Sequence, residues 1–489
     1  MSPSKIEKNE KIDADVAVIG GGLCGMAAAV AAAEQGARVV LVEKKGAPGG
    51  NSLFVVGIFG AESPAQRRLS IDTPKDELFR LAMDYAHWKI NPRIFRAFLD
   101  KSGDTIKWLE DKGIRFDNIP PLYPGHVIRT WHSTVKENVG PVILKTLRQN
   151  CEQLGVRMLF HCSARKILVG DSGVTGLLAE SANGNIEIIA GSVIIATGGY
   201  GGNPDMLRKY HPAYSEKMIY SGLPHLVGEG LTMAEEVGAA TEGLGTLVLH
   251  THIYPGPSDV NGMTQEPATL WVNRRGERFT DEMITFQPTE CGNVIERQPD
   301  KCVYTAFDES IMRKVMEDGF LKGDVGGKPG AAGTIPVNLD MELAEEVAKG
   351  DVKITDSWGE MAAWIGVPAE VLKNTVEEYN SFCDQGYDGL FNKDRRYLRA
   401  LRTPPYYAIK SHLCFLTTVG GIKINERMET LDGEDSPIPG LYAGGDITGG
   451  WESDTYCILL SGTTSGFAIN SGRIAGENAA EYGSKRDDI

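Results

Sequence analysis

Residues 15–44 read DVAVIGGGLCGMAAAVAAAEQGARVVLVEK and predict a strand, a glycine turn, a helix and a second strand that ends in an acidic residue. Gly20, Gly22 and Gly25 occupy the three glycine positions of a dinucleotide fingerprint. The first permits the tight turn, the second lets a pyrophosphate approach the backbone, and the third lets helix and strand pack closely. Glu43 can accept hydrogen bonds from ribose hydroxyls. We therefore expect a dinucleotide-binding unit around this stretch.

The composition is that of a globular protein. The 489 residues are 42% hydrophobic, and 50 basic against 65 acidic side chains give a net charge of −15. This negative charge argues against nucleic acid and anionic membrane surfaces as partners. The first 14 residues, MSPSKIEKNEKIDA, are polar, and no apolar run is long enough to span a membrane, so we expect a cytoplasmic protein. The eight cysteines and nine histidines show no CxxC or HExxH spacing, and we expect no metal site.

The residue pattern changes along the chain and indicates two domains. Glycine-ended strands are expected on both sides of the central part of the chain, at 192–203 (SVIIATGGYGGN) and at 438–450 (IPGLYAGGDITGG). Between them, glycine- and proline-rich loops alternate with helical segments such as 341–350 (MELAEEVAKG). We expect a discontinuous cofactor domain, residues 1–245 and 406–489, interrupted by a second domain over residues 246–405.

With both ends in view, the chain resembles the flavoprotein family of fumarate reductase and succinate dehydrogenase. The resemblance rests on GGGLCG, VEK, GGNS, VIIATGGYGGN, VNRRGERFTDE and GLYAGGDITGG followed by GRIAGENAA, in family order. It implies an α/β protein with a Rossmann-like FAD-binding domain and an inserted α+β capping domain. The covalent branch of the family carries a histidine in the loop that here reads GGNSLF, so the resemblance implies FAD that is bound non-covalently.

The resemblance also implies which residues hold FAD. Gly20, Gly22 and Gly25 fall at the pyrophosphate, Glu43 at the adenosine ribose and Asp446 at the ribityl chain. The residues expected to line the cofactor are Gly20, Gly21, Gly22, Cys24, Gly25, Glu43, Lys44, Gly50, Asn51, Ser52, Gly57, Ala164, Gly198, Gly199, Gly445, Asp446, Gly462, Thr463 and Thr464.

The substrate positions depart from the family pattern. Fumarate reductases carry an arginine that acts as the acid toward the substrate shortly after VNxxGxRFxNE, and a second substrate arginine after the GDITGG turn. In this chain Phe286 and Leu459 fall near these two positions. Arginine forks bind carboxylates bidentately, so their loss argues against a dicarboxylate substrate. We expect a bulkier, largely neutral substrate in a pocket that includes Phe54, Phe286 and Leu459.

Reduction of a double bond also needs a proton donor. Tyr456 in SDTYCILLSG is the first candidate, because the 3-ketosteroid dehydrogenases of this superfamily carry a tyrosine in a similar place. His250 and His252 in LHTHIYPGP are further candidates, because family members often have a substrate-side histidine in this region.

These features predict an FAD-dependent oxidoreductase that acts on a carbon–carbon bond of a ring-containing substrate. An isoflavonoid is one class, since the superfamily includes enzymes of the tetrahydrodaidzein reductase type, and a steroid enone is the other. A fumarate-like dicarboxylate reductase, an amino-acid oxidase similar to aspartate oxidase and a non-catalytic electron carrier are alternatives. Electrons could be exchanged with NAD(P)H, a ferredoxin or free flavin.

Overall fold

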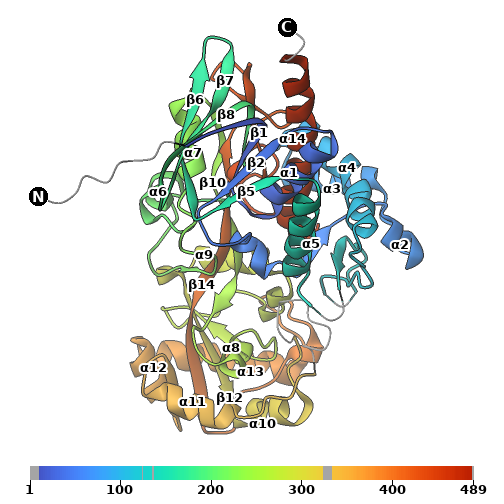
Figure 1. Ribbon diagram of the computed structural model, residues 1–489. Helices are drawn as coiled ribbons and strands as arrows, with labels where there is room; N and C mark the ends of the chain where they lie inside the picture. Colours follow the sequence, from blue (N-terminus) through green and yellow to red (C-terminus); the bar gives the residue numbers. More distant parts are fainter. Residues whose placement is uncertain (1–9, 124, 135–136, 323–332, 487–489) are drawn as a thin grey trace, which may run out of the picture. The chain divides into compact units, whose positions relative to one another are not determined.

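The computed structural model describes residues 10–123, 125–134, 137–322 and 333–486 of the chain (Figure 1). The chain divides into two compact units. Unit 1 comprises residues 1–212, 222–247 and 417–489, and unit 2 comprises residues 213–221 and 248–416. Of the four boundaries between the units along the chain, two lie within long strands, β10 (Thr241–Ile253) and β14 (Tyr406–Ile422).

Unit 1 is built on a sheet with strand order β15-β16-β8-β1-β2-β5. Its central pairs are parallel, β16 with β8, β8 with β1, β1 with β2 and β2 with β5. The hairpin of β6 and β7 continues antiparallel from β8. The strands of this sheet are β1 (Glu10–Ile19), β2 (Val39–Glu43), β5 (Arg157–Phe160), β6 (Cys162–Gly170), β7 (Gly173–Ser181), β8 (Gly184–Ile195), β15 (Glu429–Leu431) and β16 (Pro437–Ala443).

Helix α1 (Leu23–Glu34) is the centre of the helical layer, and α5 (Val139–Gln153) and α14 (Thr463–Arg486) lie beside it (Figure 1). A Cβ on Gly472 of α14 would come within 2.2 Å of the Cys24 carbonyl oxygen, and one on Gly476 within 2.3 Å of the Ala28 carbonyl oxygen. These two glycines therefore allow α14 to pack directly on the α1 backbone.

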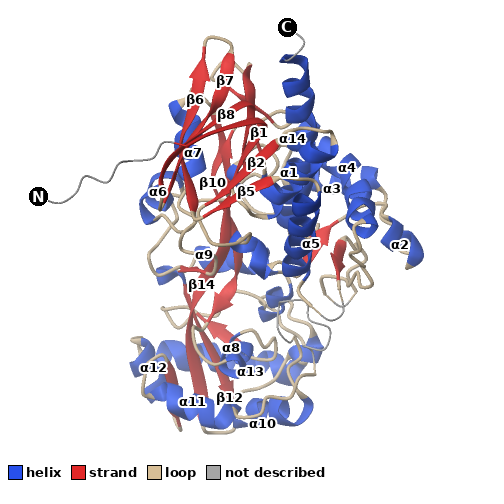
Figure 2. Ribbon diagram, viewed as in Figure 1, coloured by secondary structure: helices blue, strands red, loops and turns tan. Residues whose placement is uncertain are grey.

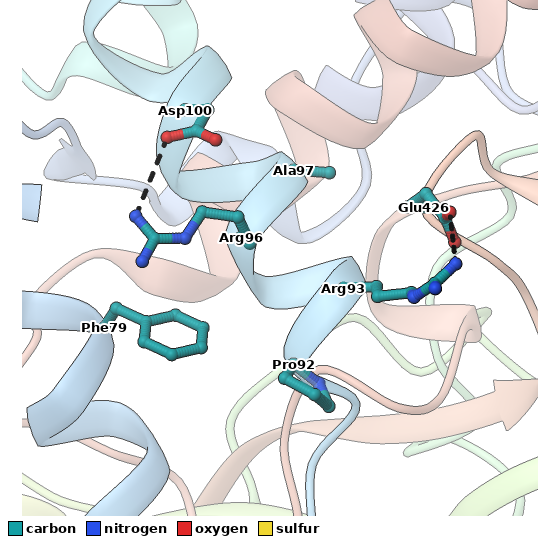
Figure 3. A pocket seen from close by; sticks show the side chains of 7 residues that line it. All are labelled: Phe79, Pro92, Arg93, Arg96, Ala97, Asp100 and Glu426. Atoms are coloured by element: carbon teal, nitrogen blue, oxygen red, sulfur yellow. Dashed lines mark hydrogen bonds and ion pairs between the residues drawn. The ribbon is translucent and has the colours of Figure 1, made fainter. Parts of the chain in front are cut away.

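The remaining elements of unit 1 surround this core. They are η1 (Gly50–Phe54), β3 (Gly57–Phe59), α2 (Pro64–Arg68), α3 (Lys75–Tyr85), α4 (Pro92–Asp111), β4 (Trp131–Ser133), α6 (Pro204–Tyr210), α7 (Glu229–Glu236) and η5 (Gly445–Ile447). A surface pocket lies against α3 and α4, and its charged groups are paired: Arg93 with Glu426 and Arg96 with Asp100 (Figure 3). Arg96 also pairs with Asp76, outside the pocket lining. No residue of the glycine turn lines this pocket.

Unit 2 is a sheet covered by helices. Strand β14 pairs antiparallel with β12 and β13 and parallel with β9, and β12 pairs antiparallel with β11. Because β9 pairs with Cys414 and Phe415, residues 213–221 belong to this unit although they precede the expected insertion. The elements are β9 (Ile219–Tyr220), α8 (Ser258–Thr264), β11 (Leu270–Val272), η2 (Glu282–Phe286), α9 (Pro288–Glu296), η3 (Pro299–Lys301), β12 (Cys302–Asp308), α10 (Glu309–Asp318), α11 (Leu339–Val347), β13 (Val352–Thr355), α12 (Trp358–Ile365), α13 (Ala369–Gln385) and η4 (Arg395–Tyr397).

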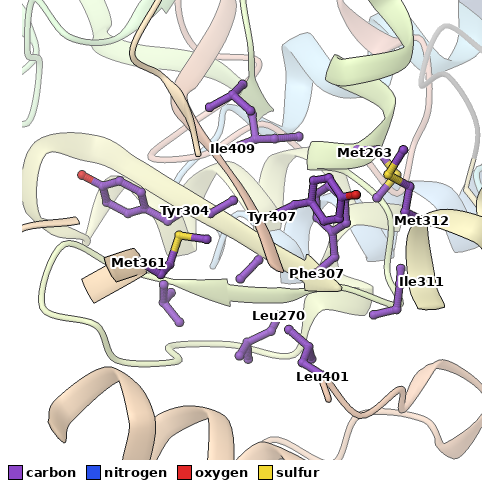
Figure 4. Packing of buried hydrophobic residues seen from close by; sticks show 14 of the residues in the cluster. Met263, Leu270, Tyr304, Phe307, Ile311, Met312, Met361, Leu401, Tyr407 and Ile409 are labelled. Carbon is purple, nitrogen blue, oxygen red and sulfur yellow. The ribbon is translucent and has the colours of Figure 1, made fainter. Parts of the chain in front are cut away.

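The core of unit 2 is apolar and aromatic (Figure 4). The rings of Phe307 and Tyr407, on neighbouring strands, stack with centroids 5.0 Å apart. Helix α10 buries Ile311, Met312 and Val315 on one face and is capped by Asp308, whose carboxylate accepts from the first free amides. Helices and strands occur in both units (Figure 2). Over the part of the chain that the structure describes, no helix has both the length and the apolar character needed to cross a bilayer.

Candidate functional site

The glycine turn between β1 and α1 has the shape that the sequence predicts. Gly20 has a φ of +105°, and a Cβ there would lie 2.4 Å from the Ala196 carbonyl oxygen. A Cβ on Gly25 would lie 1.9 Å from the Gly20 carbonyl oxygen. Gly22 is the N-cap of α1 and has no side chain to satisfy the first amides of the helix. The turn therefore brings bare backbone and a helix N-terminus to one place, as a pyrophosphate requires.

Glu43 and Lys44 follow the second strand. The Glu43 carboxylate accepts from the backbone amides of Gly21 and Lys45, at 2.7 Å each, which fixes it against the turn. The Lys44 ammonium lies 2.7 Å from the Glu229 carboxylate of α7 and 2.5 Å from the His225 carbonyl oxygen. Its side chain is therefore engaged within unit 1.

The GGNS loop forms η1 and is tied to three other segments. The Ser52 hydroxyl accepts from the Leu23 amide of α1 at 3.0 Å, and the Asn51 side chain accepts from the Leu223 amide at 2.9 Å. Gly140 of α5 packs on the Ser52 carbonyl oxygen, where a Cβ would come within 2.0 Å. Gly50 has a φ of +68°, and Phe54 at the end of the loop is 55% exposed.

Further glycines of the expected site have a left-handed backbone or a close neighbour. Gly198 has a φ of +72°, and a Cβ on Gly199 would lie 2.3 Å from the Thr418 hydroxyl. A Cβ on Gly57 of β3 would lie 2.2 Å from the Trp131 ring nitrogen. Ala164 lies on β6, where it pairs with Ala179.

The C-terminal turn carries an acid next to a small-residue helix. Asp446 is half-buried, and burial raises its pKa to about 6, although a hydrogen bond of 2.9 Å from Thr417 opposes the shift. The Gly445 amide donates to the Ser471 hydroxyl at 2.9 Å. Burial raises the pKa of Cys24 to about 12, so this thiol is a packing group at neutral pH.

The start of α14 closes on β3. The Gly462 carbonyl oxygen accepts from the Phe59 amide at 3.0 Å, and the Ser465 hydroxyl donates to the Gly57 carbonyl oxygen at 2.8 Å. Thr463 and Thr464 form the first turn of the helix. The Thr464 amide approaches the Tyr456 hydroxyl at 3.5 Å.

Tyr456 and Leu459 precede α14, and the sequence predicts that both face the substrate. Tyr456 is 3% exposed, and burial raises its pKa to about 12. Leu459 is half-buried. Glu452 lies on the same segment and is 4% exposed; one of its oxygens has no partner among the described residues, and burial raises its pKa to about 8.

Unit 2 holds the other expected substrate residues. Phe286 ends η2, is half-buried and has its ring 6.1 Å from that of Tyr397. The other end of η2 is fixed by Glu282, which is fully buried between the Arg278 guanidinium at 2.9 Å and the Lys393 ammonium at 3.0 Å. Burial opposes ionisation of Glu282, but the two cations hold its pKa below the usual value.

The two histidines of β10 are neutral at physiological pH. Burial lowers the pKa of both His250 and His252 to about 3, and the positive charge of Lys322 adds to the effect. His252 is fully buried, with its Nδ1 2.5 Å from the Ser411 hydroxyl and its ring edge-on to Trp271. A neutral imidazole can accept or donate one hydrogen bond at each nitrogen but is a poor acid.

Sequence reasoning missed the surroundings of Lys322. Its ammonium is bound by Gln265 and Thr285, which are far away in the chain and share no motif with it. Over the described residues, no group of three or more His, Cys, Asp or Glu side chains could hold a metal ion.

Comparisons with known proteins support the assignment of the glycine turn to an FAD-binding domain. The profile of a family described as "FAD binding domain" matches residues 15–456. Vinyl phenol reductase from Lactiplantibacillus plantarum is 31% identical over 483 residues, which cover 96% of each chain. NADH:fumarate oxidoreductase from Klebsiella pneumoniae is 27% identical over 470 residues, and the chain spans 48% of its length. A solved open conformation of a flavocytochrome c3 fumarate reductase has a TM-score of 0.75 at 26% identity, covering 96% of this chain and 79% of the other.

Proposed function

Because the chain belongs to the FAD binding domain family, we propose that this FAD-dependent oxidoreductase reduces a carbon–carbon double bond conjugated to a ring in a largely neutral substrate. A phenol that carries a vinyl group is the first candidate, since the relative named vinyl phenol reductase matches over nearly the full length of both chains. An isoflavonoid and a steroid enone are the second and third candidates.

One observation carries the preference for a neutral substrate. Phe286 and Leu459 fall where the family resemblance places the two carboxylate-binding arginines, and both are half-buried. Apolar side chains leave a carboxylate without the paired donors that compensate for its loss of water. This disfavours the fumarate-like and aspartate-oxidase-like alternatives, which both need a carboxylate anchor.

The residues of unit 1 fit FAD. The glycine turn at the N-terminus of α1 suits the pyrophosphate, the fixed carboxylate of Glu43 suits the ribose, and Asp446 suits the ribityl hydroxyls. We place the isoalloxazine against the first turn of α14, and we propose non-covalent attachment because residues 49–54 contain no histidine. When bound and reduced, FAD supplies a hydride.

We propose Tyr456 as the proton donor. Its raised pKa keeps the phenol protonated at neutral pH, and the nearby amide of Thr464 can stabilise the phenolate that remains after proton transfer. His250 and His252 are neutral and suit a role in orienting the substrate.

The test of the substrate class is an anaerobic titration, followed by flavin absorbance, of the photoreduced enzyme with 4-vinylphenol, an isoflavonoid, a steroid enone and fumarate, and of the oxidised enzyme with aspartate, which would reduce the flavin of an amino-acid oxidase. We expect rapid reoxidation by 4-vinylphenol and none by fumarate. Rapid reoxidation by fumarate would refute the argument from Phe286 and Leu459. If none of the alkenes reoxidises the flavin, the result would favour the alternative of a non-catalytic electron carrier. The same oxidised enzyme, mixed with NADH, NADPH, reduced ferredoxin or reduced free flavin, identifies the donor.

The test of the proton donor is Tyr456→Phe. We expect kcat to fall by about 10²- to 10⁴-fold, the range for loss of a general acid, while the flavin spectrum is retained. Tyr442→Phe is the matched control, because Tyr442 is also a buried tyrosine of unit 1 and donates to the Asn478 carbonyl oxygen. An unchanged kcat in Tyr456→Phe would exclude this role.

A further inference from the structure

A buried acid, Glu452, stands on the segment of unit 1 that leads into α14 and carries Tyr456. Trp451, directly before it, is fully buried, and its ring stacks on that of Phe467 with centroids 4.3 Å apart. The indole nitrogen of Trp451 donates to the Thr448 carbonyl oxygen at 3.0 Å. These contacts fix the backbone on which Glu452 stands.

The chain folds back sharply after Glu452. Ser453 and Thr455 form an isolated bridge, and the Thr455 amide donates to the Ser453 carbonyl oxygen at 2.6 Å. Beyond this turn, the Cys457 amide donates to the Glu452 carboxyl group. The turn therefore brings the carboxyl group of Glu452 against the residue that follows Tyr456.

Tyr456 is held on the same turn. Its carbonyl oxygen accepts from the Tyr85 hydroxyl of α3 at 3.2 Å and from the Ile458 amide at 3.0 Å. Its own hydroxyl lies 3.5 Å from the Thr464 amide, and the phenol interacts electrostatically with Glu452. The phenol and the carboxyl group are therefore two acids of one small, fixed turn.

Both acids are closed off from solvent. The side chains of Tyr456 and Glu452 are buried, and Glu452 Oε1 has no hydrogen-bond partner among the described residues. Buried polar atoms in native proteins are nearly always paired, so an unengaged carboxyl oxygen calls for a role. A buried phenol that gives up its proton must recover one, and a neighbouring carboxyl group with an unengaged oxygen can supply it.

Other charged groups lie around the turn. Glu242 of β10 lies against the same segment, since a Cβ on Gly450 would come within 2.9 Å of its Oε2. Asp454 is paired with Lys89, and both side chains are exposed. Burial raises the pKa of Glu452 to about 8, so this carboxyl group carries a proton at neutral pH.

We infer that Glu452 returns a proton to Tyr456 after the phenol has protonated the substrate. This inference rests on the proposed function, in which Tyr456 is the proton donor, and it adds a residue that acts through Tyr456. Both residues belong to unit 1, so the relay is built within one compact unit.

The relay moves protons in succession. The O–H bond of Tyr456 breaks as its proton forms the new C–H bond of the substrate, and the phenolate is left beside the Thr464 amide. The O–H bond of Glu452 then breaks, and its proton restores the phenol. The Glu452 carboxylate that remains takes a proton from solvent. The electron pair of the reduction comes with the hydride, so the relay itself neither oxidises nor reduces.

The test is a single turnover in a stopped-flow experiment. Photoreduced holoenzyme is mixed anaerobically with 4-vinylphenol, and the absorbances of flavin and of tyrosinate are recorded in wild type and in Glu452→Gln. We expect flavin reoxidation close to the wild-type rate, because Tyr456 starts out protonated in both proteins. The tyrosinate signal should last about 10²-fold longer in Glu452→Gln, the lower end of the range for loss of an acid. Tyr456→Phe should give no such signal, which identifies its source.

Two further variants and the pH dependence separate a relay from a packing role. Glu242→Gln is the matched control, because Glu242 is half-buried beside the same segment and its Oε2 has no partner in the described part of the chain. Glu452→Asp keeps a carboxyl group and should recover part of the fast decay. In wild type the tyrosinate should last longer as the pH rises through about 8, because Glu452 then loses its proton, whereas Glu452→Gln should not respond.

The failures are distinguishable. If 4-vinylphenol does not reoxidise wild type, or if Tyr456→Phe keeps its kcat, the proposed function is wrong and the relay falls with it. If wild type reacts but no longer-lived tyrosinate appears in Glu452→Gln, the relay is overturned while the proposed function stands. An equal slowing of flavin reoxidation and tyrosinate decay would also overturn the relay, because it would indicate disturbed packing.

Discussion

The two units prepare their sites in different ways. In unit 1 the cofactor positions are shaped by the absence of side chains, since Gly20 and Gly25 leave no space for a Cβ. In unit 2 the polar contacts join side chains from distant segments, as Lys322 and Thr285 illustrate. A site made of backbone is tied to a local sequence pattern, whereas a site made of side chains can change its chemistry while the fold is retained.

The units also differ in how they treat buried charge. Glu282 of unit 2 is compensated by Arg278 and Lys393, and its pKa lies below the usual value. Glu452 of unit 1 is equally buried, but its pKa is raised to about 8 because burial dominates. The first arrangement is a fixed structural network, and the second is a group that can change its protonation state near neutral pH.

The largest expected effect tests the backbone site of unit 1. Gly25→Ala places a Cβ 1.9 Å from the Gly20 carbonyl oxygen, which forces α1 away from β1. We expect the purified variant to lack flavin absorbance and to lose about 3 kcal/mol or more of unfolding free energy. Gly433→Ala is the control, since Gly433 is exposed and has open space around it. Normal FAD content in Gly25→Ala would contradict the role of this turn.

The next effect tests the ion network of unit 2. Arg278→Met removes the cation that lies 2.9 Å from Glu282 and 2.8 Å from Asp388, both fully buried. We expect a loss of about 3 to 5 kcal/mol in urea unfolding, because two carboxylates remain buried with one partner fewer. Arg313→Met, at an exposed pair with Glu309, should cost less than about 1 kcal/mol. Similar losses in the two variants would show that the network is not a special feature of unit 2.

A smaller effect tests the uncompensated acid of unit 1. The pKa of Glu452 rises from 4.5 to about 8 on folding, so between these values the unfolded chain ionises at this residue while the folded chain stays protonated. The contribution of Glu452 to stability is fully present below pH 4.5 and is lost as the pH rises through about 8.

Glu452→Gln should therefore lose the slope that Glu452 causes. Between about pH 5 and about pH 7 we expect wild type to lose about 2 to 3 kcal/mol relative to the variant in urea unfolding. Glu434→Gln, at an exposed site, should run parallel to wild type. If the profile of Glu452→Gln is also parallel to wild type, Glu452 is not held protonated in the folded protein.

How much could be predicted from the sequence also differs between the local pattern of unit 1 and the long-range contacts of unit 2. The strand, turn, helix and second strand expected in residues 15–44 are confirmed as β1, α1 and β2, because glycine spacing and hydrophobic pattern are local signals. The α/β fold, the family and FAD as cofactor are confirmed by the match over residues 15–456. The roles of the individual site residues stay predictions.

Contacts between segments that are far apart in the sequence could not be predicted. The pairing of β9 with β14, which brings residues 213–221 into unit 2, leaves no mark in local composition. The contacts of Lys322 with Gln265 and Thr285 are similar, because these three residues have no shared spacing in the sequence. Such contacts depend on the packing of the whole unit. In the sequence, the absence of arginine at Phe286 and at Leu459 is the signal that points to a changed substrate side.

The most direct test of the central claim is a single-turnover product analysis. The photoreduced enzyme is mixed anaerobically with equimolar 4-vinylphenol and fumarate, quenched, and both products are quantified by chromatography against the FAD content. We predict one 4-ethylphenol formed for each reduced FAD and no succinate. Succinate as the main product would contradict the account, because it would mean that a chain with Phe286 and Leu459 at the arginine positions still selects a dicarboxylate.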